Sequence, residues 1–239
     1  MPPMKKITAF LQDPRKGDPL EIGNSHVERL AGVRWLDTHL VDFLLQRCLA
    51  CLQLDANLLV PSSNASSIVE QMLRKTNIYR APEKKSCRNM SMLYQYYALQ
   101  PHRMVGCVCH GDHFYVVDVN FNAKEPGVFK TVKVYDSVRR PNTRRGGDTI
   151  LRNTGIAHFL TNLQRFLLYF CFPESTNTNV RENELVSRAT YAPCPFQENG
   201  SDCSLFAVIT LLHVVGKVPL SDTTFCQNQI TQLRHALHT

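Results

Sequence analysis

The chain has 239 residues, of which 44% are hydrophobic, and this length and composition indicate a globular protein with one domain. Its nine cysteines are an odd number without a recurring CxxC pair, which argues against a disulfide framework or a zinc ribbon and favours a reducing compartment. Lysine and arginine outnumber aspartate and glutamate by 27 to 20, but the excess is spread along the chain, so charge alone identifies no acidic partner.

Residues 1–28 combine proline, glycine and charged residues, so we expect a partly ordered lead-in before a single domain at residues 29–239. The two lysines near the start are followed by no sustained apolar stretch, which argues against a signal peptide or a membrane anchor. We therefore expect the protein in the cytoplasm or the nucleus, either of the cell that makes it or of a host cell.

The first part of the predicted domain is helical. Apolar residues recur at helical spacing and predict a helix over residues 37–52, with Asp37 or Thr38 as its cap. Trp35, the only tryptophan, stands just before this helix. Residues 68–75 predict a second, shorter helix after a break that is rich in serine and asparagine.

The middle of the chain is the most strand-like. Residues 103–109, 113–121 and 128–136 are rich in valine, phenylalanine and tyrosine and are bounded by turn residues, so they predict consecutive antiparallel strands. Hairpin turns are expected at residues 110–112 and 122–127.

A loop at residues 137–148 carries four arginines, and we expect it to be solvated. Amphipathic spacing predicts a helix over residues 148–170, a strand over 184–194 and a C-terminal helix over 222–237. The order of these elements predicts an α+β fold with a small central, mainly antiparallel sheet flanked by helices.

Residues 205–215 are almost all apolar and predict a buried helix that begins close to Cys203. Unpaired amides and the positive end of the helix dipole favour a thiolate there, the form in which cysteine is a nucleophile. Gln197 stands six residues earlier (203 − 197), on a loop from which its amide can donate to a developing oxyanion. The segment alone fits a small buried hydrophobic cysteine equally well.

A cysteine nucleophile needs a base, and the base needs an acceptor that orients it. His113 begins a predicted strand, and Asp136 closes the next strand along the chain. If the two strands are antiparallel neighbours, the start of one lies beside the end of the other, and these two side chains meet. The sequence therefore predicts an imidazole oriented by a carboxylate.

Three segments carry a resemblance to a known family: HF at 113–114, VYDSV at 134–138 and PFQENGSDCSLF at 195–206. They resemble the ubiquitin-like-protein-specific cysteine proteases of clan CE, the SUMO (sentrin) protease family, which show His-Trp, Tyr-Asp-Ser and Gln-x-Asn-x-x-Asp-Cys-Gly in this chain order. RWLDTHLVDFLL at 34–45 also looks like the family's early Trp-Leu-Asn/Asp segment.

The resemblance implies a papain-like α+β fold and hydrolysis of peptide or isopeptide bonds after the C-terminal diglycine of SUMO or another ubiquitin-like modifier. It implies that Cys203 is the nucleophile and His113 the general base and later the acid. Asp136 would orient the His113 ring, and Gln197 would form an oxyanion hole with the Cys203 backbone N–H. Trp35 would cover a tunnel so narrow that only glycine, which lacks a Cβ, passes through it.

Two residues depart from the family pattern. Ser204 replaces the usual glycine after the nucleophile, and Phe114 replaces the tryptophan after the histidine, which keeps an aromatic wall for substrate but loses the indole donor. The arginine-rich loop after Asp136 and residues 121–129 look like local insertions.

Three other interpretations remain open. A zinc site could form where two cysteines and two histidines fall within seven residues, although a second paired cluster is missing. An effector acetyltransferase of the same clan would pass through an acyl-cysteine, and the arginines at 139–145 could bind phosphate. A non-catalytic module for binding ubiquitin-like proteins would need no triad. The residues of the zinc alternative are Cys107, Cys109, His110 and His113.

As partners we expect a ubiquitin-like modifier, namely SUMO, a Nedd-type modifier or ubiquitin, together with its conjugates. We expect no cofactor, no metal, no membrane or nucleic-acid partner, and a monomer.

Overall fold

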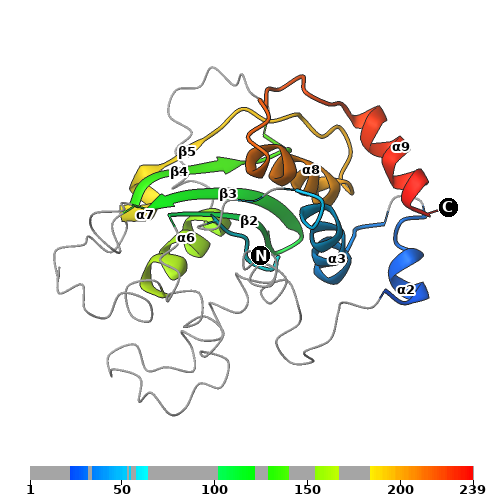
Figure 1. The fold of residues 1–239 in the computed structure, drawn as a ribbon, viewed down its shortest axis with the longest axis horizontal. Coiled ribbons are helices and arrows are strands. Elements are labelled where there is room, and N and C mark those ends of the chain that lie inside the picture. The colour runs from blue at the N-terminus through cyan, green and yellow to red at the C-terminus, as the bar shows by residue number, and fades with distance from the viewer. Residues whose placement is uncertain are drawn as a thin grey trace, which may run out of the picture.

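The computed structural model places a five-stranded sheet between helices (Figure 1). It describes residues 22–31, 34–52, 54, 58–63, 102–121, 129–139, 154–166 and 184–238. The predicted helix over 68–75 and the predicted turn at 122–127 lie outside these ranges. The elements are α2 (Asn24–Val27), α3 (Thr38–Leu49), β1 (Leu58–Leu59), β2 (Arg103–His110), β3 (His113–Phe121), β4 (Phe129–Tyr135), α6 (Thr154–Phe166), α7 (Glu184–Arg188), β5 (Ala189–Tyr191), α8 (Cys203–Val215) and α9 (Gln227–His238).

The strands lie in the order β1-β2-β3-β4-β5. The three long central strands pair antiparallel, whereas the short strands at both edges pair parallel to their neighbours. A two-residue turn joins β2 to β3 between His110 and His113, and Gly111 has φ of 60° there, a conformation that glycine adopts without a Cβ clash. The predicted α+β fold, its central strands and its first hairpin are therefore confirmed.

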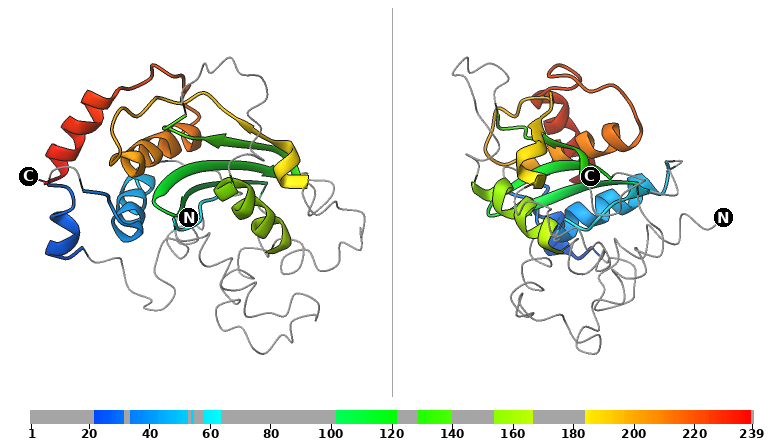
Figure 2. Two further views of the ribbon diagram at one scale, coloured as in Figure 1. Left: turned by 180° about the vertical axis from the view of Figure 1, so that it is seen from behind. Right: turned by 90° about the vertical axis from the view of Figure 1, so that its left-hand side faces the viewer.

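Helices cover both faces of the sheet (Figure 2). One face packs with α3 and α8 into a shared core, to which the sheet contributes Val105, Cys107 and Val116. Successive side chains of a strand point to opposite faces, so the equally buried Val117 and Val119 face the other side, along which α6 and α7 lie. Burial on both faces explains why β3 reads as a nearly continuous apolar run.

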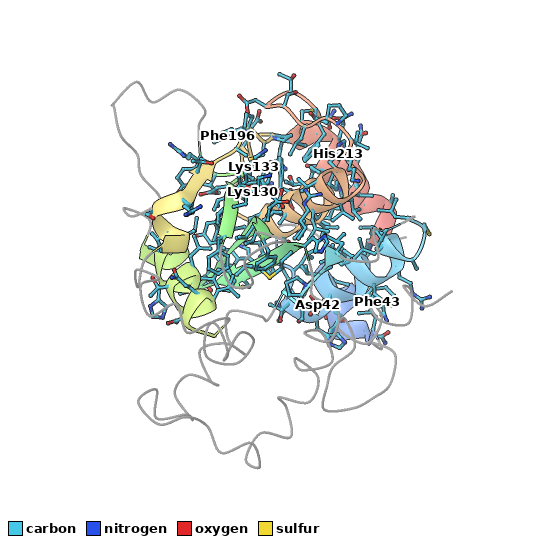
Figure 3. All side chains as sticks on the ribbon, turned by 60° about the vertical axis from the view of Figure 1, so that its left-hand side comes forward. Asp42, Phe43, Lys130, Lys133, Phe196 and His213 are labelled. Atoms are coloured by element: carbon cyan, nitrogen blue, oxygen red, sulfur yellow. The ribbon has the colours of Figure 1, made fainter. Side chains whose placement is uncertain are left out.

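The helix α3 is fixed at two polar points. The Asp37 side chain accepts from Leu40 N at 2.9 Å, which confirms the predicted cap. Asp42 of α3 (Figure 3) accepts from the Ser62 hydroxyl at 2.5 Å and the Ser63 amide at 2.7 Å. Burial raises the pKa of Asp42 to about 6, although these hydrogen bonds work against the rise. The contacts tie α3 to the segment that follows β1.

The predicted strand over 184–194 is wrong in its first half, because residues Glu184–Arg188 form the helix α7 and only Ala189–Tyr191 form β5. The helix packs against α6 and β4, and the Arg188 guanidinium donates to the Phe129 carbonyl at 2.6 Å. Tertiary contacts therefore decide the conformation of this short segment, and strand propensity does not.

The C-terminal helix begins at Gln227, five residues later than the predicted start at 222 (227 − 222). Ser221 and Thr224 form a polar turn there, in which the Ser221 amide donates to the Thr224 hydroxyl at 2.7 Å. A side chain that satisfies the backbone in this way competes with a helical turn. Of the helix predicted over 148–170, the structure describes Thr154–Phe166.

The most apolar helix is α8, and residues 203–208 at its start are all buried. It packs against β2, β3 and α3 at the centre of the molecule. In the part of the chain that the structure describes, neither α8 nor any other helix has the length and apolar character needed to cross a membrane. The candidate nucleophile, Cys203, is the first residue of this buried helix.

Candidate active site

The predicted nucleophile, Cys203, is the first residue of α8 and is 3% exposed. Asp202 takes the N-cap position, and its carbonyl accepts from Phe206 N at 3.0 Å. The amides that precede Phe206 have no partner within the helix, as at the start of any α-helix. They lie at the same helix end as the sulfur, and such amides favour a thiolate.

The structure forms the imidazole–carboxylate pair that the strand order predicts. His113 opens β3 and Asp136 follows β4, and the antiparallel register of the two strands sets Val116 beside Tyr135. Nε2 of His113 lies 2.9 Å from Oδ1 of Asp136. The same oxygen accepts from the Val138 amide at 3.1 Å, so the carboxylate is held from two sides.

The His113 ring is also held in place by its neighbours. Tyr115 packs edge-on against it, with the ring centroids 4.5 Å apart and the planes at 88°. Because Nε2 is bound to Asp136, Nδ1 is the ring nitrogen that remains for a second partner. The Cys203 side chain is hydrogen-bonded to His113, so the three residues from β3, β4 and α8 form one connected group.

The charges of this group favour an imidazolium. Burial lowers the pKa of His113, but the hydrogen bonds and negative charges of Asp136 and Cys203 raise it, and the net result is a rise from 6.5 to about 9. An imidazolium beside a thiolate can do two things: the sulfur can attack a carbonyl without first losing a proton, and the ring can protonate a leaving group.

Gln197 lies between β5 and α8 and is 3% exposed. The backbone N–H of Gln197 donates to the Ser137 backbone carbonyl at 2.7 Å. The Ser137 hydroxyl donates to the side-chain carbonyl of Gln197 at 3.1 Å. Its side-chain nitrogen donates to the backbone carbonyl of Asn199 and lies 3.4 Å from Asn199 Oδ1. These bonds fix which end of the amide faces Ser137. A role at the oxyanion stays a prediction.

The two aromatic residues of the predicted site differ in exposure. Trp35 is 42% exposed on the segment before α3, which leaves an indole face open to a ligand. Phe114 is 5% exposed and belongs to the core shared with α8. Its predicted contact with substrate stays a prediction, and its observed contacts are those of a packing residue.

Sequence reasoning assigns no role to Ser137, Asn199 or Arg234, yet each binds a residue of the site. Ser137 is the serine of the Tyr-Asp-Ser segment and Asn199 the asparagine of the Gln-x-Asn segment, so their places in these motifs are a usable signal. Arg234 lies in α9, and nothing in its local sequence marks it as buried, although it is only 3% exposed. It forms an ion pair with Asp202 at 2.7 Å.

The cysteines of the zinc alternative are packed in β2. Burial raises the pKa of Cys107 well above its ordinary value and that of Cys109 to about 11. Within the described ranges, no three histidine, cysteine, aspartate or glutamate side chains are placed to hold a metal ion. Both thiols therefore fit a role in the core better than a role as ligands.

The arrangement of helices and strands matches solved structures. The SUMO protease Ulp1, with its catalytic cysteine oxidized to a sulfinic acid, aligns with a TM-score of 0.58 over 98% of this chain and 91% of that chain, at 16% sequence identity. The chain has the Ulp1 fold. The fold that the resemblance implies is thus confirmed.

Two further structures share the Ulp1 fold with this chain. The C-terminal Ulp1 protease domain in complex with Smt3, the yeast ortholog of SUMO, aligns at 15% identity with a TM-score of 0.57, over 98% of this chain and 91% of that one. The catalytic domain of the Ulp1-like SUMO protease of Chaetomium thermophilum aligns at 14% identity with a TM-score of 0.51, over 98% and 85%. The sequence matches no protein-family model and no curated protein. At such identities the likeness establishes the Ulp1 fold, and the chemistry is argued from the side chains.

Proposed function

We propose that the protein is a cysteine protease that cleaves SUMO or another ubiquitin-like modifier after its C-terminal diglycine, from conjugates and from precursors. The observation that carries the proposal is the connected group of Cys203, His113 and Asp136 at the start of a buried helix. A cysteine that served only packing would need neither a charged imidazole nor a carboxylate behind that imidazole.

In the proposed reaction the Cys203 sulfur attacks the carbonyl carbon of the last modifier glycine. His113 Nδ1 gives its proton to the leaving amine as the C–N bond breaks, and a thioester remains. His113 then takes a proton from a water molecule, whose oxygen attacks the thioester carbonyl. The C–S bond breaks, Cys203 returns to a thiolate beside the imidazolium, and the modifier leaves as a carboxylate after its acid proton passes to solvent. Asp136 holds the ring in place and stabilises its charged form throughout.

The negative oxygen that forms in each attack needs hydrogen-bond donors. The Cys203 backbone N–H has no partner within α8 and lies on the nucleophile itself. The side-chain nitrogen of Gln197 is the second donor that we propose. Ser137 holds the carbonyl end of that amide, one N–H donates to the Asn199 carbonyl, and the other N–H would serve the oxyanion.

The substrate class rests on the fold and on Trp35. The Ulp1 fold has been solved with a SUMO ortholog bound. The Arg234 guanidinium donates to the carbonyls of both Arg34 and Ser201, so the backbone just before Trp35 lies near the segment that leads into Cys203. The Trp35 side chain is exposed. An indole in this place fits a cover over a diglycine tail. We propose the cytoplasm or nucleus as the place of action.

A panel of SUMO, Nedd-type and ubiquitin probes with electrophilic C-termini tests both activity and modifier choice. We expect a covalent adduct with at least one probe, detected as a mass shift, and its loss in Cys203→Ala. Cleavage of an isopeptide-linked conjugate of the same modifier should follow the same pattern. If no probe reacts while Cys203 is alkylated by iodoacetamide, the proposal is wrong, and acetyl transfer from a coenzyme A thioester would favour the acetyltransferase.

A further inference from the structure

Asp202 stands at the N-cap of α8, yet its side chain makes no capping hydrogen bond. Its carboxylate is 2% exposed and points away from the helix amides toward three other side chains. Oδ1 pairs with the Arg234 guanidinium at 2.7 Å. Oδ2 accepts from Asn199 at 2.8 Å and from Gln227 at 2.7 Å.

An aspartate at this position ordinarily accepts from the amides two and three residues further on. In this chain those are the amides of Ser204 and Leu205, next to the Cys203 sulfur. A capping carboxylate there would neutralise the helix dipole and place a negative charge beside the thiolate, which would make the thiolate less stable. The observed direction of Asp202 avoids both effects.

Arg234 is the charged one of the three side chains that hold Asp202 in this direction. It is 3% exposed and belongs to α9, which lies at the edge of the molecule with its C-terminal end above α2 (Figure 1). Besides the ion pair, it donates to the carbonyls of Arg29 at 3.1 Å, Arg34 at 2.7 Å and Ser201 at 3.3 Å. It therefore joins the segments on both sides of the site.

We propose that Arg234 is a positioning residue that holds the Asp202 carboxylate away from the first amides of α8, so that these amides serve the Cys203 sulfur and the developing oxyanion. This inference rests on the proposed function, because it takes Cys203 as the nucleophile. Arg234 touches neither the substrate nor the reacting atoms and acts through Asp202.

The test measures the rate of alkylation of Cys203 by iodoacetamide against pH, with mass spectrometry to resolve Cys203 from the other thiols. In Arg234→Met the bonds from Asn199 and Gln227 hold Oδ2, but Oδ1 loses its ion pair and can turn toward the amides. We expect the midpoint of the profile to move up by about one pH unit. With a modifier substrate, kcat should fall about tenfold, with little change in KM.

The double variant Asp202→Asn/Arg234→Met separates positioning from a purely structural role. Removal of the negative charge should return the midpoint to within a few tenths of a pH unit of the parent value. A merely structural Arg234 would leave the double variant no better than Arg234→Met, and that result, or no shift in Arg234→Met, overturns the proposal.

Arg103→Met is the matched control, because Arg103 forms the partly buried ion pair at the other end of α8. It should lower the melting temperature without moving the alkylation midpoint, and an equal shift in this control overturns the proposal. If Arg234→Met does not fold, Arg234→Lys replaces it, with about half the shift expected and no shift as the contrary result. Alkylation needs no modifier, so the two failures are distinguishable: a failed protease assay refutes the proposed function, whereas an unmoved alkylation midpoint in Arg234→Met refutes the positioning of Asp202.

Discussion

Two ion pairs hold β3 to its neighbours, one toward each end of the strand. Toward one end, Arg103 of β2 binds Asp118 with two hydrogen bonds of 2.8 and 2.9 Å and donates to the Val214 carbonyl of α8 at 3.3 Å. At the other end, His113 binds Asp136 with one hydrogen bond of 2.9 Å. Both pairs lie at β3 and near α8. They differ in whether the cation keeps a nitrogen for a proton-transfer partner.

Arginine stays charged over the whole physiological pH range, and its fork holds Asp118 and a helix carbonyl at once. Histidine titrates, and its second ring nitrogen remains for Cys203. An ion pair between strands thus serves stability at one end of β3. At the other end the cation is a histidine, which can lose its proton and has a second nitrogen, and this makes that end suitable for proton transfer.

The largest expected effect comes from Asp136→Asn. The amide cannot stabilise the imidazolium by charge, so we expect kcat to fall by about 10³ to 10⁴. The melting temperature should change by only a few degrees, because the Val138 amide can still donate to the new side-chain oxygen. Steady-state cleavage of a modifier conjugate measures the first quantity, and a rate close to that of the parent protein would refute the role of Asp136.

Arg103→Met should have the opposite effect, a large loss of stability with little change in turnover. Loss of the cation leaves Asp118 buried without its partner, and we expect the free energy of unfolding to fall by about 3 kcal/mol. Turnover measured well below the melting temperature should stay within about twofold of the parent, since α8 starts at its other end from Val214. Urea unfolding gives the first value. A large loss of turnover with unchanged stability would remove the distinction between the two pairs.

The smallest effect is a pH dependence that only the histidine pair should show. The pKa of His113 is raised to about 9, so its pairing stabilises the fold fully below about pH 6.5, and this contribution is lost as the pH rises through 9. We expect His113→Gln to cost about 2 kcal/mol of stability at pH 6 and close to none at pH 9.5. The cost of Arg103→Met should be equal at both values. A constant cost for His113→Gln would contradict the raised pKa.

The main parts of the site could be predicted because local rules place them. Antiparallel pairing of two consecutive strands brings His113 to Asp136, and an apolar helix that starts at Cys203 sets the sulfur at its amides. These are short-range consequences of strand alternation and of where a helix begins. Their catalytic roles remain predictions until activity is measured.

The supports of the site could not be predicted in the same way. Hydropathy treats arginine as a surface residue, and only the partners of Arg234, far away in the sequence, explain its burial. The helix α7 could not be predicted from the sequence either. Its five residues are too few to show a helical period, and packing against α6 and β4 decides their conformation.

The contacts of Arg234 with Arg29 and Arg34 join residues 205 and 200 positions apart. Closing so long a loop has an entropic cost that a contact within one helix does not have. The proposed role of Arg234 therefore makes the full nucleophilicity of Cys203 depend on the docking of α9. If Arg234 positions Asp202 as proposed, a chain in which α9 is not yet docked would carry a less reactive Cys203 thiol.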